Sequence, residues 1–473
     1  MLEDVISAKK ALFESGAHTE LRMQKNRERR VTLLAGNVVA NTRSDIAGVS
    51  ARVYRGGRYG FSSMAECSGE AAEKVLRAAS ENAAFMSSHA PADKPPLPPV
   101  PRERFILCDA ANDPAQQVYT DAARMLDSYV AQHCPKLISR RIVAMEDSME
   151  KLLVTGNGNA ASGGISSGDG PDAHTFLPRS YVYVNLTAET NDGTPVELLQ
   201  ALGGEGTFDL NFADPAVYFP RIDELYERLM HKREGVYADA GLKTVILGGT
   251  LTGMLSHEAV GHTVEADLVL GGSVAGHCLN KQVGSELVTL TDFAHTAFGR
   301  RCPLPVYMDD EGTPARDVTL IENGILTGYM NNRETALRFG MEPCGNARAW
   351  LFSDEPLIRM RNTAIHPGRD KLEEMIASVD DGYYLISSGN GQADTTGEFM
   401  FGITMGYEIR KGKLARPLLD TTISGVAFDM LKTVDMVSDH VEWEDWGFCG
   451  KKQPMPVGLG GPALRCRVMI GGR

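Results

Sequence analysis

The segment with the clearest capacity for chemistry is Ser256-His257-Glu258-Ala259-Val260-Gly261-His262, in which a glutamate directly follows one histidine and a second histidine comes five positions after the first. Neutral imidazoles are good ligands for zinc, and a carboxylate beside them can accept a proton from water that the metal activates. These residue types predict a zinc hydrolase, with His257 and His262 as ligands and Glu258 as the general base. Two unrelated polar histidines on a helix are the plainer interpretation.

The spacing of the two histidines is one residue longer than in the zincin helix, where ligands four apart share a face. Five steps of roughly 100° leave the two imidazoles about 140° apart on a regular α-helix, so they could not meet at one ion. A π-type turn would bring them together, and Gly261 is the residue best suited to permit it. We therefore expect a wide turn, or a helix end, at Val260-Gly261-His262.

A buried strand followed by a helix is expected to position this motif. Residues 244–247 are apolar and partly β-branched, and Gly248-Gly249 is typical of a turn. Thr250 would then be the N-cap of the helix that carries the histidines.

A zinc site needs a third protein ligand, and spacing cannot choose among the candidates Glu265, Asp267, His277, Cys278 and Cys449. Gly447 and Gly450 flank the Phe448-Cys449 pair and let the backbone approach closely, and the lysines that follow would favour the thiolate. A free, buried cysteine is the alternative interpretation for Cys449.

Beyond this motif, the chain resembles the TldD/PmbA family, and specifically its TldD branch. The resemblance rests on several motifs in one order: the HExxxH segment with Glu265, then residues 309–314, 321–326, 391–394, 449–451 and 456–458. It implies a zinc metallopeptidase that acts on unfolded or modified peptides, with Zn²⁺ held by His257, His262 and Cys449. It also implies a dimer, as a homodimer or as a heterodimer with a PmbA/TldE-like paralog.

Two segments depart from the family pattern, residues 291–295 and residues 452–454, and they leave the substrate details open. Asn346 and Arg348 are candidate binders of a carbonyl or carboxylate, with surface polar residues as the plainer interpretation. Two other functions stay open: a non-catalytic partner subunit, as in the paralogous branch, and a regulatory binding protein of the DNA gyrase modulator type.

Composition narrows the class of protein. The chain has 473 residues, a formal net charge of −13 and a pI near 5.4, which argues against nucleic-acid binding. The arginine-rich residues 22–30 are interpreted as a solvated face of a sheet. Eight cysteines without a close CxxC pair, and no recognisable signal peptide, favour the cytoplasm, and no apolar run is long enough to span a membrane.

The pattern of apolar residues predicts an α+β protein. We expect an N-terminal mixed α/β domain with an antiparallel sheet and helices at residues 1–237, and a β-rich C-terminal domain at residues 238–473 that carries the motif helix. Helices are predicted at 2–15, from a capping box at 63–66 to about 86, at 115–132 and at 220–234; strands at 181–184 and 399–409; hairpins at Gly56-Gly57 and Asn323-Gly324; a proline-rich connector at 91–101; and a flexible loop at 156–170.

Overall fold

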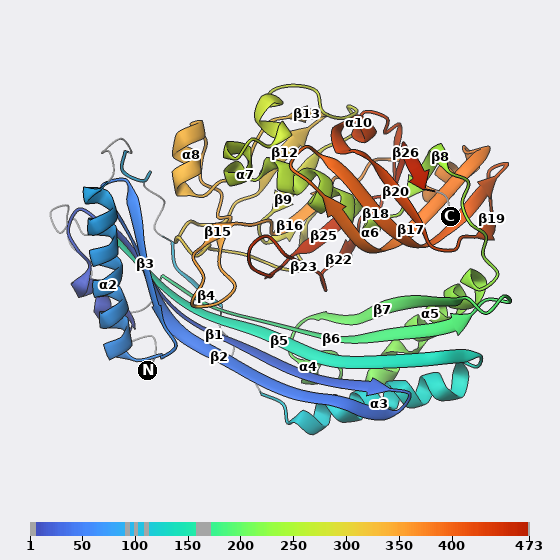
Figure 1. Ribbon diagram of the computed structural model, residues 1–473, viewed down its shortest axis with the longest axis horizontal. Coiled ribbons are helices and arrows are strands. Elements are labelled where there is room, and N and C mark those ends of the chain that lie inside the picture. The colour runs from blue at the N-terminus through green and yellow to red at the C-terminus, as the bar shows by residue number, and fades with distance from the viewer. Residues whose placement is uncertain (1–5, 90–94, 99–102, 108–112, 158–171, 472–473) are drawn as a thin grey trace.

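A long curved sheet and a second group of sheets form the two layers of this protein, seen in a computed structural model that describes residues 6–89, 95–98, 103–107, 113–157 and 172–471. Figure 1 shows the curved N-terminal sheet (blue to green) running beneath the C-terminal strands (yellow to red). This arrangement confirms the α+β fold class. Most of the expected connector at 91–101 and of the expected loop at 156–170 lies outside the described residues.

The N-terminal sheet is built from unusually long antiparallel strands. Its spatial order is β3-β2-β1-β5-β6, with β7 also paired to β6 and with the short β4 parallel to β6. The strands are β1 (His18–Leu34), β2 (Asn37–Arg55), β3 (Arg58–Met64), β4 (Phe105–Leu107), β5 (Leu137–Asn157), β6 (Ala173–Glu189) and β7 (Pro195–Glu205). The predicted hairpin at Gly56-Gly57 joins β2 to β3, and the predicted strand at 181–184 lies within β6.

Helices cover this sheet at two places. Figure 1 shows α2 (Gly69–Ser88) at one end and α3 (Gln116–His133) beneath the other, where α5 (Phe219–Lys232) packs against β6, β7 and α3. Both α3 and α5 lie within two residues of their predicted bounds. The predicted capping box is wrong, because Ser63 and Met64 pair with β2 and the N-cap of α2 is Ser68, whose Oγ accepts the Ala71 N–H at 3.1 Å. The other short elements described in this region are two 3₁₀ helices (Ala8–Leu12 and Pro215–Tyr218) and α4 (Phe208–Asn211).

The arginines of β1 are not all on a solvated face, so that prediction is wrong for Arg22 and Arg29, which are buried. The guanidinium of Arg29 pairs with Asp45 and Asp113 at 3.1 and 3.0 Å. That of Arg22 donates to the Asp354 carbonyl at 2.7 Å. Buried guanidinium groups are tolerated when such acceptors surround them.

The C-terminal strands form a closed circuit and an open sheet. The circuit pairs β17-β8-β26-β20-β18 and returns from β18 to β17. These strands are β8 (Gly241–Leu247), β17 (Asp381–Ala393), β18 (Glu398–Arg410), β20 (Thr421–Val426) and β26 (Leu464–Gly471), with β19 (Lys413–Pro417) and β21 (Met436–Val437) at its edges. The predicted strand at 399–409 is β18.

The open sheet packs against the helix that follows β8. Its order is β13-β12-β9-β16-β25-β22. It comprises β9 (Leu290–Phe293), β12 (Val318–Glu322), β13 (Ile325–Leu326), β16 (Asn362–Ile365), β22 (Glu442–Glu444) and β25 (Gly458–Gly461). Asn323 and Gly324 have φ angles of 47° and 81°, so the predicted hairpin between β12 and β13 is confirmed.

Short elements fill the rest of the C-terminal region. They are α7 (Ala266–Leu270), a 3₁₀ helix (Val274–His277), β10 (Thr296–Ala297), β11 (Arg300–Arg301), α8 (Arg333–Phe339), β14 (Ala347–Arg348), β15 (Leu357–Ile358), α9 (Leu372–Ala377) and α10 (Ala427–Leu431). The N-terminal sheet ends with β7 at Glu205 and the C-terminal strands begin with β8 at Gly241. We propose a domain boundary near residue 238, in the segment between these two strands.

Candidate metal centre

The HExxxH segment lies on a helix that changes its winding. Helix α6 (Gly249–Leu255) begins directly after β8, and Gly248 is its N-cap in place of the predicted Thr250, whose hydroxyl instead donates to the Ile386 carbonyl at 3.1 Å. From Ser256 to Gly261 the helix widens into a π-helical turn, followed by a short 3₁₀ segment, His262–Val264. The predicted wide turn is therefore confirmed, and a π-helical turn places residues five apart on one face.

Gly261 is required at this turn for a reason that the sequence did not reveal. Its φ of −55° is ordinary helical geometry, so conformational freedom does not explain it. A Cβ atom at this position would lie 2.1 Å from Met360 Sδ. The glycine therefore lets the side chain of Met360 pack directly against the turn.

His257 and His262 meet Cys449 at one point. One potential ligand atom from each residue lies within 4.8 Å of the other two, and Cys449 Sγ is 3.4 Å from His262 Nε2. Cys449 is on the two-residue strand β23 (Phe448–Cys449), which pairs with β24 (Met455–Pro456). Residues almost 190 positions apart in the sequence thus form one cluster, which has the two nitrogens and one sulfur of a zinc site.

The other four candidates for the third ligand lie elsewhere. Glu265 binds the opposite nitrogen of His262, Nδ1, at 2.8 Å. Asp267 forms an ion pair with Lys451, and His277 is exposed on its 3₁₀ helix. Cys278 packs against the edge of the hydrophobic core. Among the described residues, Cys449 is the candidate whose ligand atom lies with the two imidazoles.

The buried polar atoms of this cluster fit a metal ion. His257 is only 1% exposed, yet neither of its ring nitrogens has a hydrogen-bond partner among the described residues. Leaving a buried polar group unsatisfied costs about 1–3 kcal/mol. A cation bound between His257, His262 and Cys449 would remove that cost, so the residues present fit the group.

The neighbouring imidazoles lower the pKa of the Cys449 thiol. Burial alone would raise the pKa of its thiol, but the imidazoles of His257 and His262 outweigh burial and lower this pKa to about 3. Burial likewise opposes the charged form of His262, but Cys449 and Glu265 raise the pKa of His262 to about 10. The two shifts favour a thiolate–imidazolium pair in the metal-free protein, so a zinc ion would bind the thiolate form of Cys449 and displace a proton from His262.

Glu258 lies beside the cluster and remains accessible. Its side chain is 26% exposed, and its Oε2 lies 3.7 Å from His262 Nε2, the nitrogen that faces Cys449. The carboxylate therefore borders the ligand atoms on a side that solvent can reach. A carboxylate in such a position can accept a proton from a nearby water molecule.

The polar residues predicted to bind a carbonyl or carboxylate are buried and bond to other parts of the protein. Asn346 is buried and donates to Asp292 Oδ2 at 2.8 Å, and Arg348 is buried and donates to the Met360 carbonyl at 2.8 Å. Asp292, in the segment that departs from the family pattern, is a fully buried partner of Arg361. These side chains hold the protein interior together.

Two features of the cysteine segment were missed or misjudged from the sequence. Lys451 was expected to favour the thiolate, but its ammonium group pairs with Glu265 and Asp267 at 3.2 and 2.8 Å. The buried Arg359, which sequence reasoning did not single out, donates to the Cys449 carbonyl at 2.7 Å and to the Gln453 carbonyl at 2.6 Å. Its only signal was an arginine next to apolar residues, which does not reveal a partner 90 positions away.

A cavity of about 590 Å³ lies between the N-terminal sheet and the C-terminal strands. Its wall includes Leu199 on β7, Ser387 on β17 and Trp446, which precedes Cys449 by three positions. This volume is typical of ligand pockets, although none of the three candidate ligands lines it.

Comparison with known proteins identifies the family. The profile of the PmbA/TldA metallopeptidase C-terminal domain matches residues 240–472, and that of PmbA/TldA metallopeptidase domain 1 matches residues 19–83. A metalloprotease of Methanocaldococcus jannaschii is 30% identical over 467 residues, which cover 96% of this chain and 97% of that protein. The chain thus shares the domains of this class of proteins. It belongs to the PmbA/TldD family.

Other relatives match over shorter stretches. A metalloprotease of Methanothermobacter thermautotrophicus is 36% identical over 63% of this chain, and the match spans 64% of the relative's length. A zinc metalloprotease TldD homolog of Saccharolobus solfataricus is 36% identical over 52% of this chain, and that match spans 56% of its length. The names of these relatives concern metal-dependent proteolysis.

Solved structures share the fold over the whole chain. A putative modulator of a DNA gyrase from Thermotoga maritima has a TM-score of 0.76 at 18% identity, and the match covers 99% of this chain and 98% of that one. TldE from Thermococcus kodakarensis has a TM-score of 0.71 at 16% identity, with 99% of both chains covered. Within the described residues, no helix is long and apolar enough to cross a membrane.

Proposed function

We propose that this chain is a zinc-dependent peptidase of the TldD type, with the metal held by His257, His262 and Cys449 and with Glu258 as general base. One observation carries the proposal. Two imidazoles and a thiolate converge from distant parts of the chain, and the imidazole of His257 is buried without a hydrogen-bond partner among the described residues. Membership of a metallopeptidase family supports the same conclusion.

In the proposed peptide hydrolysis, the metal and Glu258 have separate roles. A zinc ion bound there would supply a Lewis acid that polarises the scissile carbonyl and lowers the pKa of a water molecule. Glu258 accepts the proton of that water as it attacks, and the same carboxyl group later gives the proton to the leaving amine. Its partial exposure, 26% of the side chain, lets substrate and water reach it.

The family also suggests a substrate, a partner and a cellular location. We propose that the substrate is an unfolded or modified peptide, and that the chain acts in the cytoplasm as a dimer, either with a second copy or with a TldE-like paralog. The full-length structural likeness to TldE is consistent with a related partner subunit. A role as a non-catalytic subunit or as a regulatory binding protein is the alternative.

Zinc content combined with peptide cleavage tests this proposal. The purified chain, alone and mixed with a TldE-like paralog, should contain one zinc per chain and cleave an unstructured peptide. Glu258→Gln should keep the zinc and reduce turnover by about 10²–10⁴-fold, because the amide keeps the shape of the carboxylate but cannot accept the proton. A wild-type preparation that holds no zinc and cleaves nothing in either mixture would favour the alternative.

A further inference from the structure

A buried ion pair lies behind the proposed metal centre. Glu265 is fully buried, and its Oε2 is 2.8 Å from His262 Nδ1 and 3.2 Å from the ammonium nitrogen of Lys451. Lys451 also pairs with Asp267 at 2.8 Å and donates to the Ile358 carbonyl at 3.0 Å. His262, Glu265 and Lys451 thus form a chain of contacts that leads away from the cluster.

The contact with Glu265 determines which nitrogen of His262 can bind a metal. Nδ1 faces the carboxylate, whereas Nε2 faces Cys449 Sγ at 3.4 Å. A hydrogen on Nδ1 that is donated to Glu265 leaves a lone pair on Nε2, directed at the cluster. The carboxylate also resists rotation of the ring, so it holds that lone pair in place.

Glu265 makes few other contacts that would explain its burial. Its second oxygen, Oε1, is buried and has no hydrogen-bond partner among the described residues. Both of its polar contacts, to His262 and to Lys451, are made through Oε2. A carboxylate placed only to stabilise the interior would be expected to satisfy both oxygens.

Lys451 connects this carboxylate to the other side of the site. It follows Cys449 by two positions in the same segment, so its ion pair with Glu265 ties the cysteine segment to the helix that carries the histidines. His262 and Cys449 are in direct contact, with Nε2 3.4 Å from Sγ. One ion pair therefore constrains both of them.

We infer that Glu265 and Lys451 are positioning residues for the metal centre: Glu265 orients His262, and Lys451 fixes the cysteine segment against that carboxylate. This inference rests on the proposed function. Neither residue is a ligand of the metal in this account. Their effect is on metal affinity, which can be measured without any substrate.

Zinc affinity, measured by competition with a chelator at one pH, tests the inference. Glu265→Gln and Lys451→Met should each weaken zinc binding by roughly 10–100-fold, the range expected for partners of a ligand. The double variant should be no more than a few-fold weaker than the worse single variant, since the two residues act as one unit. Lys451→Arg should recover most of the loss, because it keeps the cation.

Lys452→Met is the matched control, because Lys452 is an exposed lysine next in the chain, and it should bind zinc like the wild type. With cobalt in place of zinc, Glu265→Gln should keep the thiolate charge-transfer band but change the visible d–d bands, a response that a merely structural role would not produce. If Glu265→Gln does not fold, the comparison of Lys451→Met with Lys451→Arg still decides.

Two outcomes separate this inference from the proposed function. If Cys449→Ser loses zinc in the same titration while Glu265→Gln and Lys451→Met stay within two-fold of the wild type, the positioning role is wrong and the metal site stands. If Cys449→Ser binds zinc like the wild type, the proposed ligand set itself is wrong.

Discussion

Two turns of the C-terminal region carry motifs through which the chain resembles the TldD/PmbA family. They differ in how their buried polar atoms are hydrogen-bonded. The π-helical turn at 256–261 carries His257, whose ring nitrogens have no hydrogen-bond partner among the described residues. The turn at 309–313 has three consecutive carboxylates, all buried and all bonded. On the proposed function, this difference separates buried polar groups that would bind a metal from those that hold the protein together.

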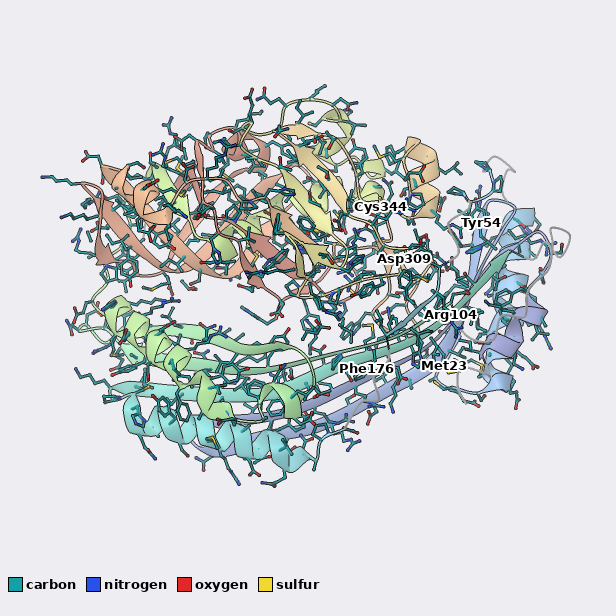
Figure 2. The ribbon with its side chains drawn as sticks, turned by 180° about the vertical axis from the view of Figure 1, so that it is seen from behind. Met23, Tyr54, Arg104, Phe176, Asp309 and Cys344 are labelled. Atoms are coloured by element: carbon teal, nitrogen blue, oxygen red, sulfur yellow. The ribbon has the colours of Figure 1, made fainter. Side chains whose placement is uncertain are left out.

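The acidic turn joins the C-terminal region to the curved sheet, and Figure 2 shows Asp309 where the two meet. Asp309 accepts the backbone N–H groups of Glu311 and Thr313, both at 2.9 Å. Asp310 accepts from Lys151 on β5 at 2.7 Å, and Glu311 accepts from Arg52 on β2 at 2.5 Å. Each of the three carboxylates therefore accepts hydrogen bonds from the surrounding protein.

The largest effect is expected at Cys449, which completes the cluster formed with the π-helical turn. Cys449→Ser should lower zinc affinity by on the order of 10³-fold or more, because a serine hydroxyl is a poor ligand and each ligand carries a large share of a binding free energy of typically 10–16 kcal/mol. Equilibrium dialysis against a zinc buffer measures this. Cys67→Ser, in the N-terminal region, is the control. Equal zinc content in both variants would move the third ligand to another candidate.

A substitution that breaks the contacts of the turn at 309–313 should lower the free energy of unfolding and leave zinc affinity unchanged. Arg52→Met removes the guanidinium that pairs with both Glu20 and Glu311, and breaking a buried ion pair by removing one partner costs about 3–5 kcal/mol. Urea unfolding should show this loss, while the folded variant keeps its zinc affinity. If Arg52→Met lowers zinc affinity but not the free energy of unfolding, the separate roles given to the two turns are wrong.

Much of the local structure could be predicted from the sequence, because it depends on local patterns. Helices α3 and α5 follow from their apolar periodicity, and the π-helical turn follows from the five-residue spacing and the need for one metal. The N-cap of α2 was misplaced because Ser63 and Ser68 both suit a helix start, and only pairing with β2 excludes Ser63.

Features that depend on distant contacts could not be predicted. The role of Lys451 is decided by Glu265, a residue 186 positions earlier in the sequence, and nothing in the local pattern points to it. The burial of Asn346 and Arg348 depends in the same way on strands from other parts of the chain. The reason for Gly261 lies in Met360 and not in its own backbone angle.

A smaller effect is expected from Gly261→Val. The new side chain would collide with Met360, and overpacking of this kind costs typically 1–3 kcal/mol, so zinc affinity should fall by roughly 10-fold as the turn shifts. Met360→Ala in the same chain should restore part of the affinity by making room. If the second substitution restores nothing, the close contact is not the reason for the glycine.

The smallest effect concerns the pH dependence of the acidic turn. Burial lowers the pKa of Lys151 to about 8, although Asp310 partly opposes this. The unfolded chain keeps that proton up to its ordinary pKa near 10.5, so the unfolded state binds more protons between about pH 8 and 10.5 and stability should rise with pH there. The rise should be about 1 kcal/mol between pH 8 and 9.

Comparison with Lys151→Met isolates this contribution, because other groups titrate in the same range in both proteins. The difference in unfolding free energy between wild type and variant should increase from pH 8 to pH 9. A difference that stays constant over this range would show that burial does not lower the pKa of Lys151.

X-ray absorption at the zinc edge tests the central claim most directly, because it counts the atoms around the metal without assuming activity. The zinc-loaded wild type should show one sulfur at roughly 2.3 Å and nitrogen or oxygen neighbours at roughly 2.0–2.1 Å, with the sulfur absent in Cys449→Ser. A zinc environment without sulfur in the wild type would contradict the assignment of His257, His262 and Cys449 as the ligand set.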